Sequence, residues 1–140
     1  MRALTLIFMT FGLFANQPDR LIMPSTEVNN YPFSDAVKVG NLLFMSGLVG
    51  NEESIGEESL VAETHSIFKQ MKAVLSAYKL SLADVVKCTV FLDDVDEWGK
   101  FNSVYTQYFT KPYPARSALG ADGLALGASL ELECIAEFKN

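Results

Sequence analysis

Hydrophobic residues recur along this chain with two different periods, which separate predicted strands from predicted helices. Over residues 129–138 apolar and charged residues alternate, which predicts a strand with one buried face and one face that meets water or a partner. Residues 85–92 (VVKCTVFL) are rich in β-branched residues and predict another strand. Residues 36–48 predict two strands around a turn, and the continuous apolar run at 42–45 is typical of a strand buried on both faces.

Two other segments carry their apolar residues one, three or four positions apart, which is helical spacing. The first helix is predicted from about Ser59, and the second has Asp94 as a candidate cap with Glu97 three residues later. Pro112 and Pro114 prevent the second helix from continuing. The apolar stripes are Ile67, Phe68, Met71, Val74, Leu75 and Tyr78 in the first helix, and Trp98, Phe101, Val104, Tyr105, Tyr108 and Phe109 in the second.

The segments between these elements complete the predicted order. Residues 16–30 are polar and form an N-terminal arm, residues 50–58 are acidic and predict a solvated loop, and residues 116–119 predict a short strand before the glycine-rich turn at 120–127. The resulting order is strand, strand, helix, strand, helix, strand, strand. This order predicts a single α+β domain over residues 31–140.

Residues 1–15 have the pattern of a secretory signal. Arg2 provides a basic start, and the run from Ala3 to Ala15 is mostly apolar and ends on a small residue before Asn16. A membrane-spanning helix needs roughly 20 apolar residues, so the run is short for that role. We expect a periplasmic or secreted protein if the segment is cleaved. The alternatives are an uncleaved anchor, or a cytoplasmic protein whose start codon was placed too far upstream.

Charge and cysteine content exclude several classes of function. The net charge of the 140 residues is -6 and the eleven basic residues are scattered, so we expect no nucleic-acid partner. Cys88 and Cys134 lack CxxC spacing, and His65 is the single histidine, so we expect no metal site. Export would make a disulfide chemically possible. Because both cysteines lie in predicted strands, we predict two separate buried thiols instead.

Arg116 and Glu131 are the main candidates for chemistry. Arg116 follows Tyr113-Pro114-Ala115, where the prolines stiffen the chain, and a guanidinium can bind a small carboxylate bidentately. The alternative is a surface arginine paired with a glutamate. Glu131 could orient a water. It shares a strand face with other glutamates, so it could equally belong to a solvated acidic stripe.

Ser46 and Asn102 are two further site candidates, whereas His65 is not. Ser46 ends an apolar strand, where its hydroxyl can bind a ligand or begin a turn. Asn102 lies one step off the stripe of the second helix, where its amide can reach a pocket or cap a loop. His65 fits a solvated helix position, and no Ser/His/Asp set can be built around it.

Four separated segments, in order, resemble motifs of the Rid (YjgF/YER057c/UK114) family. The segment PARSALGADGLALGASLELECIAEF is similar to the family's C-terminal signature, and YPFSDAVKVGNLLFMSG is similar to its G-P-Y-S-x-A-V opening. LADVVKCTVFL and WGKFNSVYTQYF resemble its central strand and second helix. The resemblance extends from about Tyr31 to Phe138.

This resemblance implies a fold, an assembly and a set of roles. The fold would be a chorismate-mutase-like mixed sheet backed by two helices and assembled as a homotrimer, with active sites in clefts between subunits and no cofactor. Arg116 corresponds to the arginine that binds the substrate carboxylate, and Glu131 to the glutamate that positions water. Ser46 and Asn102 match polar pocket residues. Phe33, also a substrate-binding position, replaces a tyrosine, and Ala118 stands where some members carry cysteine.

The function implied is hydrolysis of reactive enamines and imines of the 2-aminoacrylate type to 2-ketoacids and ammonia. Imines hydrolyse spontaneously, so orientation by one arginine and one placed water could suffice. An alternative is a non-catalytic trimer that binds small carboxylates or acts as a chaperone. A ribonuclease is disfavoured, because the net charge is -6 and no histidine pair or basic cluster is present.

Overall fold

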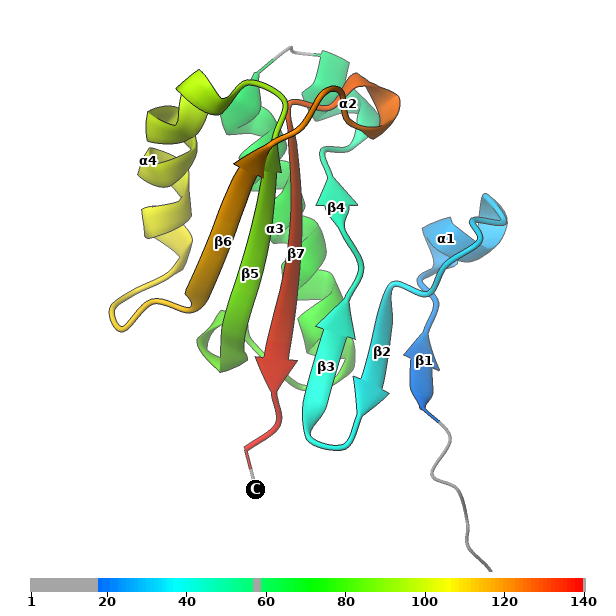
Figure 1. The fold of residues 1–140 in the computed structure, drawn as a ribbon. Helices are drawn as coiled ribbons and strands as arrows, with labels where there is room; N and C mark the ends of the chain where they lie inside the picture. The colour runs from blue at the N-terminus through cyan, green and yellow to red at the C-terminus, as the bar shows by residue number, and fades with distance from the viewer. Residues whose placement is uncertain (1–17, 57–58, 140) are drawn as a thin grey trace, which may run out of the picture.

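Seven strands form one mixed sheet in the part of the chain that the computed structural model describes, residues 18–56 and 59–139. The strand order is β1-β2-β3-β7-β5-β6, with β4 also paired to β7 (Figure 1). The β5–β6 pair is parallel and the other pairs are antiparallel. The strands are β1 (Asp19–Leu21), β2 (Ala36–Val39), β3 (Leu42–Met45), β4 (Leu48–Val49), β5 (Val85–Leu92), β6 (Ala115–Gly120) and β7 (Leu130–Glu137).

Helices cover one face of this sheet. Helix α3 crosses behind its centre, and α4 lies beside the β6 edge (Figure 1). The Ser59 side chain caps α3 by accepting a hydrogen bond from the backbone N–H of Ala62. The α-helices are α1 (Pro24–Val28), α2 (Glu52–Gly56), α3 (Leu60–Ala77) and α4 (Trp98–Tyr108), and short 3₁₀ turns occupy Leu82–Asp84, Val95–Glu97 and Ala125–Gly127.

The predicted fold class and element order are confirmed, with additions at the segments predicted to be irregular. The segment predicted as a polar arm contains β1, which pairs with β2, and α1. The predicted loop at 50–58 contains α2. The Asp94 side chain caps the 3₁₀ turn that precedes α4, by accepting from the backbone N–H of Asp96, rather than capping α4 itself.

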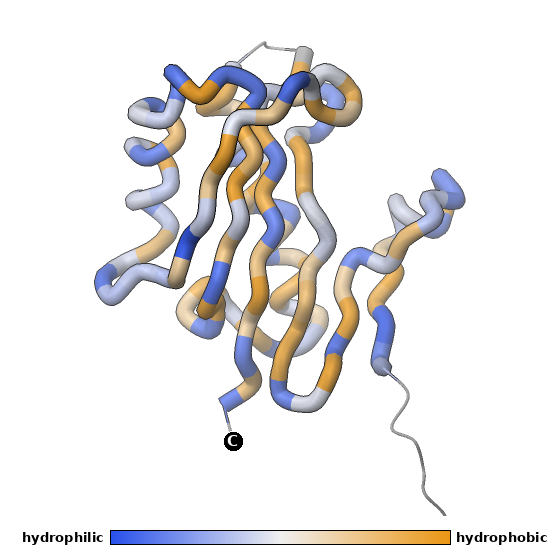
Figure 2. The backbone as a smooth tube through the Cα atoms, in the orientation of Figure 1, coloured by the Kyte–Doolittle hydropathy of each residue, from blue (hydrophilic) through white to orange (hydrophobic). Residues whose placement is uncertain are grey.

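The core lies between the sheet and α3, where the predicted stripes meet alternate residues of the strands. Figure 2 shows the alternation of hydropathy along β7. Its buried residues face the helices, and Glu131, Glu133, Ile135 and Glu137 face the other side. The predicted stripe of the first helix is buried apart from the half-buried Tyr78. This agreement follows from the 3.6-residue and two-residue periods.

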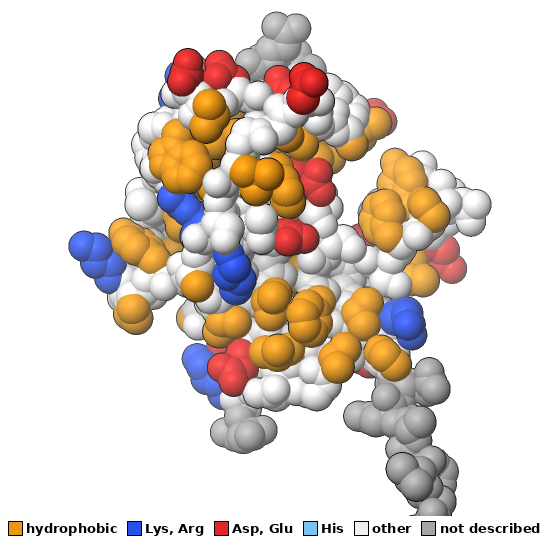
Figure 3. Space-filling model, viewed as in Figure 1, with side chains coloured by type: hydrophobic (Ala, Val, Ile, Leu, Met, Phe, Trp, Pro, Cys, Tyr) orange, Lys and Arg blue, Asp and Glu red, His pale blue; other side chains and the backbone are white. Residues whose placement is uncertain are grey.

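The prediction that residues 42–45 are buried on both faces is wrong for the protomer. Leu43 and Met45 are buried, whereas Phe44 is 42% exposed. The reason is that the described helices cover one face of the sheet and leave the other open. Phe44 lies on this open face with its register partners Val37 and Ile135. Figure 3 shows hydrophobic side chains gathered over β2, β3 and β7 on this side.

The prediction of two separate buried thiols is also wrong, because Cys88 and Cys134 form a disulfide. The two residues are direct register partners in the antiparallel β5–β7 pair, with their Cα atoms 4.1 Å apart. Side chains of such opposed residues point to the same face of the sheet, so the two sulfur atoms meet in the core. The bridge joins the two central strands.

No helix in the part of the chain that the structure describes is long and apolar enough to cross a membrane. The predicted signal, residues 1–15, lies outside the described residues.

Loss of the disulfide is expected to destabilise the fold. The bond closes a loop with a sequence separation of 46. Constraining a loop of that size in the unfolded chain contributes about 2–4 kcal/mol. Urea unfolding of the oxidised protein should therefore give a free energy higher by that amount than unfolding in dithiothreitol.

The double variant Cys88→Ala/Cys134→Ala is the control. It should match the reduced protein and should not respond to reductant. Equal unfolding free energies of the wild-type protein with and without reductant would contradict the stabilising role of the bridge.

Candidate active site

Arg116 lies near the start of β6 and its side chain points to the helix side of the sheet. Its register partner on β5 is the buried Cys88. The guanidinium carbon Cζ lies over three aromatic rings of α4, 5.3 Å from the centroid of Trp98, 5.6 Å from that of Phe101 and 4.8 Å from that of Tyr105. Each ring attracts the cation through its quadrupole. The short strand and the α4 stripe together hold the guanidinium in place.

Arg116 makes no ion pair within the described residues. The ion pairs found there join Lys100 to Glu97 and Lys139 to Asp84. The alternative of a surface arginine paired with a glutamate therefore does not describe this residue in the protomer. The guanidinium keeps its capacity to bind an external carboxylate.

Asn102 and Arg116 line one cavity of about 320 Å³. The other lining residues are Tyr105, Thr106, Tyr113 and Pro114. The cavity thus combines one charged group, one amide and aromatic walls, a composition common in small-ligand sites.

Tyr105 contributes a polar group that the helical pattern concealed. The residue is 4% exposed, and its hydroxyl has no hydrogen-bond partner among the described residues. Burial raises the pKa of Tyr105, and the nearby charge of Arg116 opposes part of that rise. In the sequence Tyr105 is one residue of the apolar stripe of α4. A hydropathy pattern identifies its ring as part of the core and gives no sign of an unpaired hydroxyl.

Glu131 lies on β7 and points to the open face. Its register partners are Phe91 on β5 and Val49 on β4. The carboxylate lies against Gly47, in the break between β3 and β4. A methyl group at Gly47 would overlap the carboxylate oxygen Oε1 and lie 2.8 Å from Cδ. Glycine at this position therefore leaves room for the carboxylate.

Arg116 and Glu131 point to opposite faces of the sheet within one protomer. The β5 residues paired with them differ accordingly, since Cys88 is buried under the helices and Phe91 is on the open face. The side chain of Lys87 donates to Ser117 across the open face, which confirms that Arg116, one residue earlier on β6, faces the other way. One protomer therefore does not bring the two predicted catalytic groups together.

Two other predicted site residues, Ser46 and Phe33, lie on the same side of the sheet as Glu131. The Ser46 hydroxyl donates to the carbonyl of Ser34 at 2.7 Å, so it holds the segment that carries Phe33. Phe33 lines a second cavity of about 340 Å³, which Gly47 also lines. Phe33 stacks on Tyr31 with ring centroids 5.5 Å apart.

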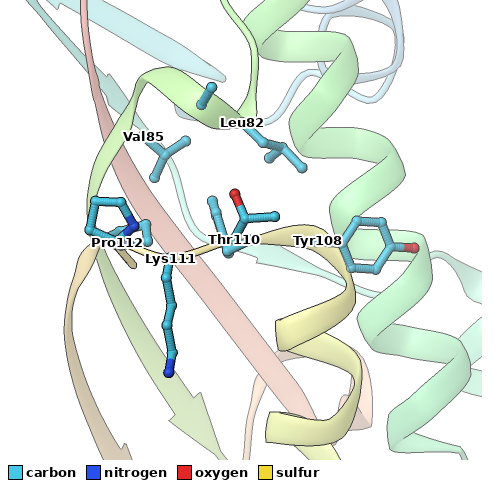
Figure 4. Close-up of a pocket in the computed structure, with 9 residues that line it drawn as sticks. Leu82, Val85, Tyr108, Thr110, Lys111 and Pro112 are labelled. Carbon is cyan, nitrogen blue, oxygen red and sulfur yellow. The ribbon is translucent and has the colours of Figure 1, made fainter.

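A third cavity, of about 330 Å³, contains none of the predicted site residues (Figure 4). It lies between the 3₁₀ turn before β5 and the segment that joins α4 to β6. Leu82, Val85 and Pro112 give it apolar walls, and the Lys111 side chain extends away from them (Figure 4). No set of groups suited to acid–base chemistry lines it.

His65 and the acidic residues do not form a metal site. Among residues 18–56 and 59–139 no group of three histidine, cysteine, aspartate or glutamate side chains could hold a metal ion. His65 is exposed on α3 and its Nδ1 lies 2.6 Å from the hydroxyl of Tyr108. The histidine links α3 to α4 rather than joining either candidate cavity.

Comparison with known proteins identifies the family. The model of the family "Endoribonuclease L-PSP" matches residues 25–138. The chain belongs to this family, and similarity to RidA places it among the Rid proteins. It is 38% identical over 108 residues to Reactive Intermediate Deaminase A, chloroplastic, of Arabidopsis thaliana, a match that covers 75% of this chain. The chain spans 58% of the length of that plant relative.

Two other similar proteins match this L-PSP family member over most of their own length, and one of them has a crystal structure. It is 36% identical over 109 residues to the 2-iminobutanoate/2-iminopropanoate deaminase of Dermatophagoides farinae, covering 74% of this chain and 84% of the relative. The crystal structure of RidA from Psychrobacter sp. PAMC 21119 matches with a TM-score of 0.71 and 36% identity, over 76% of this chain and 89% of that one.

The contact between Gly47 and Glu131 can be tested by substitution. In Gly47→Ala the new methyl group should push the Glu131 carboxylate aside rather than unfold the protein, because the atoms it meets end a flexible side chain. A crystal structure should show the displaced carboxylate, with a loss of stability of about 1 kcal/mol.

Gly99→Ala is the matched control, since a methyl group there meets no atom within 4 Å and the residue lies in α4. It should leave Glu131 in place and leave stability unchanged or slightly higher. An unmoved Glu131 carboxylate in Gly47→Ala would refute the contact.

Proposed function

We propose that this protein hydrolyses imines and enamines derived from amino acids to 2-ketoacids and ammonia. The observation that carries the proposal is Arg116, a guanidinium with no carboxylate partner among the described residues, beside Asn102 in one cavity. Such a group can bind the carboxylate of a small acid through two parallel hydrogen bonds. Similarity to the plant and mite deaminases supports the same activity.

The reaction needs little chemical assistance. An enamine first takes a proton on carbon and loses one from nitrogen, which gives the imine. Water then adds to the imine carbon, the nitrogen takes protons, and the carbon–nitrogen bond breaks to release ammonia and leave the ketone. We assign Glu131 to holding the attacking water and accepting its proton. Arg116 fixes the carboxylate and thereby the position of the imine carbon.

The active site would form between two copies of the chain. Arg116 and Glu131 point to opposite faces of one sheet, so a small substrate cannot touch both within a protomer. The open face carries apolar side chains, including Phe44, that a second copy would bury. A cyclic homotrimer, as the family resemblance implies, would place the β6 edge of one subunit against the β7 face of the next.

Mixed trimers test this arrangement. Arg116→Ala and Glu131→Gln should each lose nearly all turnover of an imine generated in situ. Co-expression of the two variants should restore activity, because about one quarter of randomly assembled sites would combine an intact Arg116 with an intact Glu131. Ketoacid release per site is the measurement.

Arg20→Ala is the matched control, because Arg20 is exposed on β1 and its side chain donates to the carbonyl of Pro18. It should retain full activity. Activity in either single catalytic variant would refute the role of that residue, and no recovery in the mixture would refute the shared site. Carboxylate binding by wild-type protein without turnover would favour a non-catalytic binding protein instead.

We further propose that the protein is exported and matures in an oxidising compartment. The basic start and apolar run of residues 1–15 support this, as does the Cys88–Cys134 disulfide, a bond that reducing cytosol disfavours.

The mass of the protein purified from its native source tests export. The mass should be that of a chain that begins at Asn16, less two hydrogen atoms, because a disulfide forms when each thiol loses one hydrogen. A chain that retains Met1 and Arg2, with both thiols free, would contradict the proposal.

A further inference from the structure

The second cavity presents apolar side chains that the fold does not bury. Tyr31 and Phe33 are each 48% exposed and Leu126 is 72% exposed, and all three line this one cavity. Tyr31 and Phe33 come from the segment before β2, whereas Leu126 comes from the loop between β6 and β7. Apolar side chains that converge from separate segments on one cavity mark a binding surface.

Several of the polar groups in and around this cavity already have hydrogen-bond partners within the protein. Thr26 donates its hydroxyl to Oδ1 of Asp35 at 2.8 Å, and the backbone N–H of Met23 donates to Oδ2 at 2.6 Å. Gln70 donates its amide to the carbonyl of Val49 at 2.9 Å. These paired groups are less available to a ligand than the exposed apolar side chains that line the same cavity.

Leu126 is held in a backbone conformation that a leucine rarely adopts. Its φ is 61° and its ψ is 13°, in the left-handed region where a branched side chain is disfavoured. The loop is fixed at its end, because Ser129 donates its N–H and its hydroxyl to the buried carboxylate of Glu63 at 2.9 and 2.8 Å. A strained, exposed leucine in an anchored loop contributes nothing to the core and points to a role toward a ligand.

The cavity also lies next to Glu131, the residue that we assign to holding the attacking water. Gly47 lines it, and the Glu131 carboxylate lies against Gly47. Its volume of about 340 Å³ would hold on the order of ten water molecules at about 30 Å³ each, so a methyl side chain would leave most of it wet.

We propose that this cavity receives the side chain of the imine and that it selects imino acids with large apolar or aromatic side chains. The inference rests on the proposed deaminase function and adds a substrate class to it. Tyr31, Phe33 and Leu126 act as specificity-determining residues. The two stacked rings, inclined by 11° to each other, offer a flat surface to a third ring.

The test compares imines generated in situ from phenylalanine, leucine and alanine by an amino-acid oxidase. The wild-type protein should show kcat/KM for the phenylalanine and leucine imines at least about tenfold above that for the alanine imine. Leu126→Gly removes the side chain and relieves the strained conformation. It should lower the phenylalanine-to-alanine ratio several-fold while the value for the alanine imine stays within about twofold.

Val28→Ala is the matched control, because Val28 is 84% exposed on α1 and does not line the cavity. It should leave the ratio unchanged. Turnover of all three imines at similar rates would overturn the specificity and leave the deaminase function standing. No turnover of any imine would overturn the function itself. Dissociation of the Leu126→Gly oligomer in sedimentation, with an unchanged ratio, would show that Leu126 is a subunit contact and overturn its assignment.

Discussion

Because successive residues of a strand point to opposite faces, the register of β5 with β6 and with β7 decides where the two candidate catalytic groups project. On β5, Cys88 points to the helix side of the sheet and Phe91 to the open side. Their register partners Arg116 and Glu131 point to the same sides as Cys88 and Phe91, respectively. A shift of either partner strand by one residue would move its candidate group to the other face. The disulfide ties β5 to β7 within the same register. The separation of the two groups is therefore built into the sheet.

The surroundings of Arg116 suit a group that must bind an anion from solution. Three aromatic rings attract the guanidinium without neutralising it, whereas a carboxylate neighbour would compete with the substrate. The packing of α4 against the β6 edge also limits the conformations of the side chain, so less entropy is lost when a ligand binds. The same α4 stripe thus serves both the core and the site.

Two buried carboxylates anchor the segments that line the second cavity. Asp35 binds the backbone and side chain of the region around α1, and Glu63 binds Ser129 at the end of the β6–β7 loop. Both carboxylates are paired with donors, as a buried charge requires. The exposed apolar residues of these segments lie outside the core, so substitutions at them would leave the sheet intact.

The periodicity of the chain determined the two long helices and the main strands, because the 3.6- and two-residue periods are local properties that burial imposes on each element. The family followed from the resemblance of four sequence motifs in order. The sequence motifs alone also gave five candidate site residues, namely Arg116, Asn102, Glu131, Ser46 and Phe33. Only the tertiary structure decided that Cys88 meets Cys134, since strand register joins residues far apart in sequence. It likewise decided that Phe44 is exposed, because a hydropathy pattern does not say how many faces of a sheet its own helices cover. The hydroxyl of Tyr105 and the strained Leu126 carried no periodic signal, and their significance lies in contacts between distant segments.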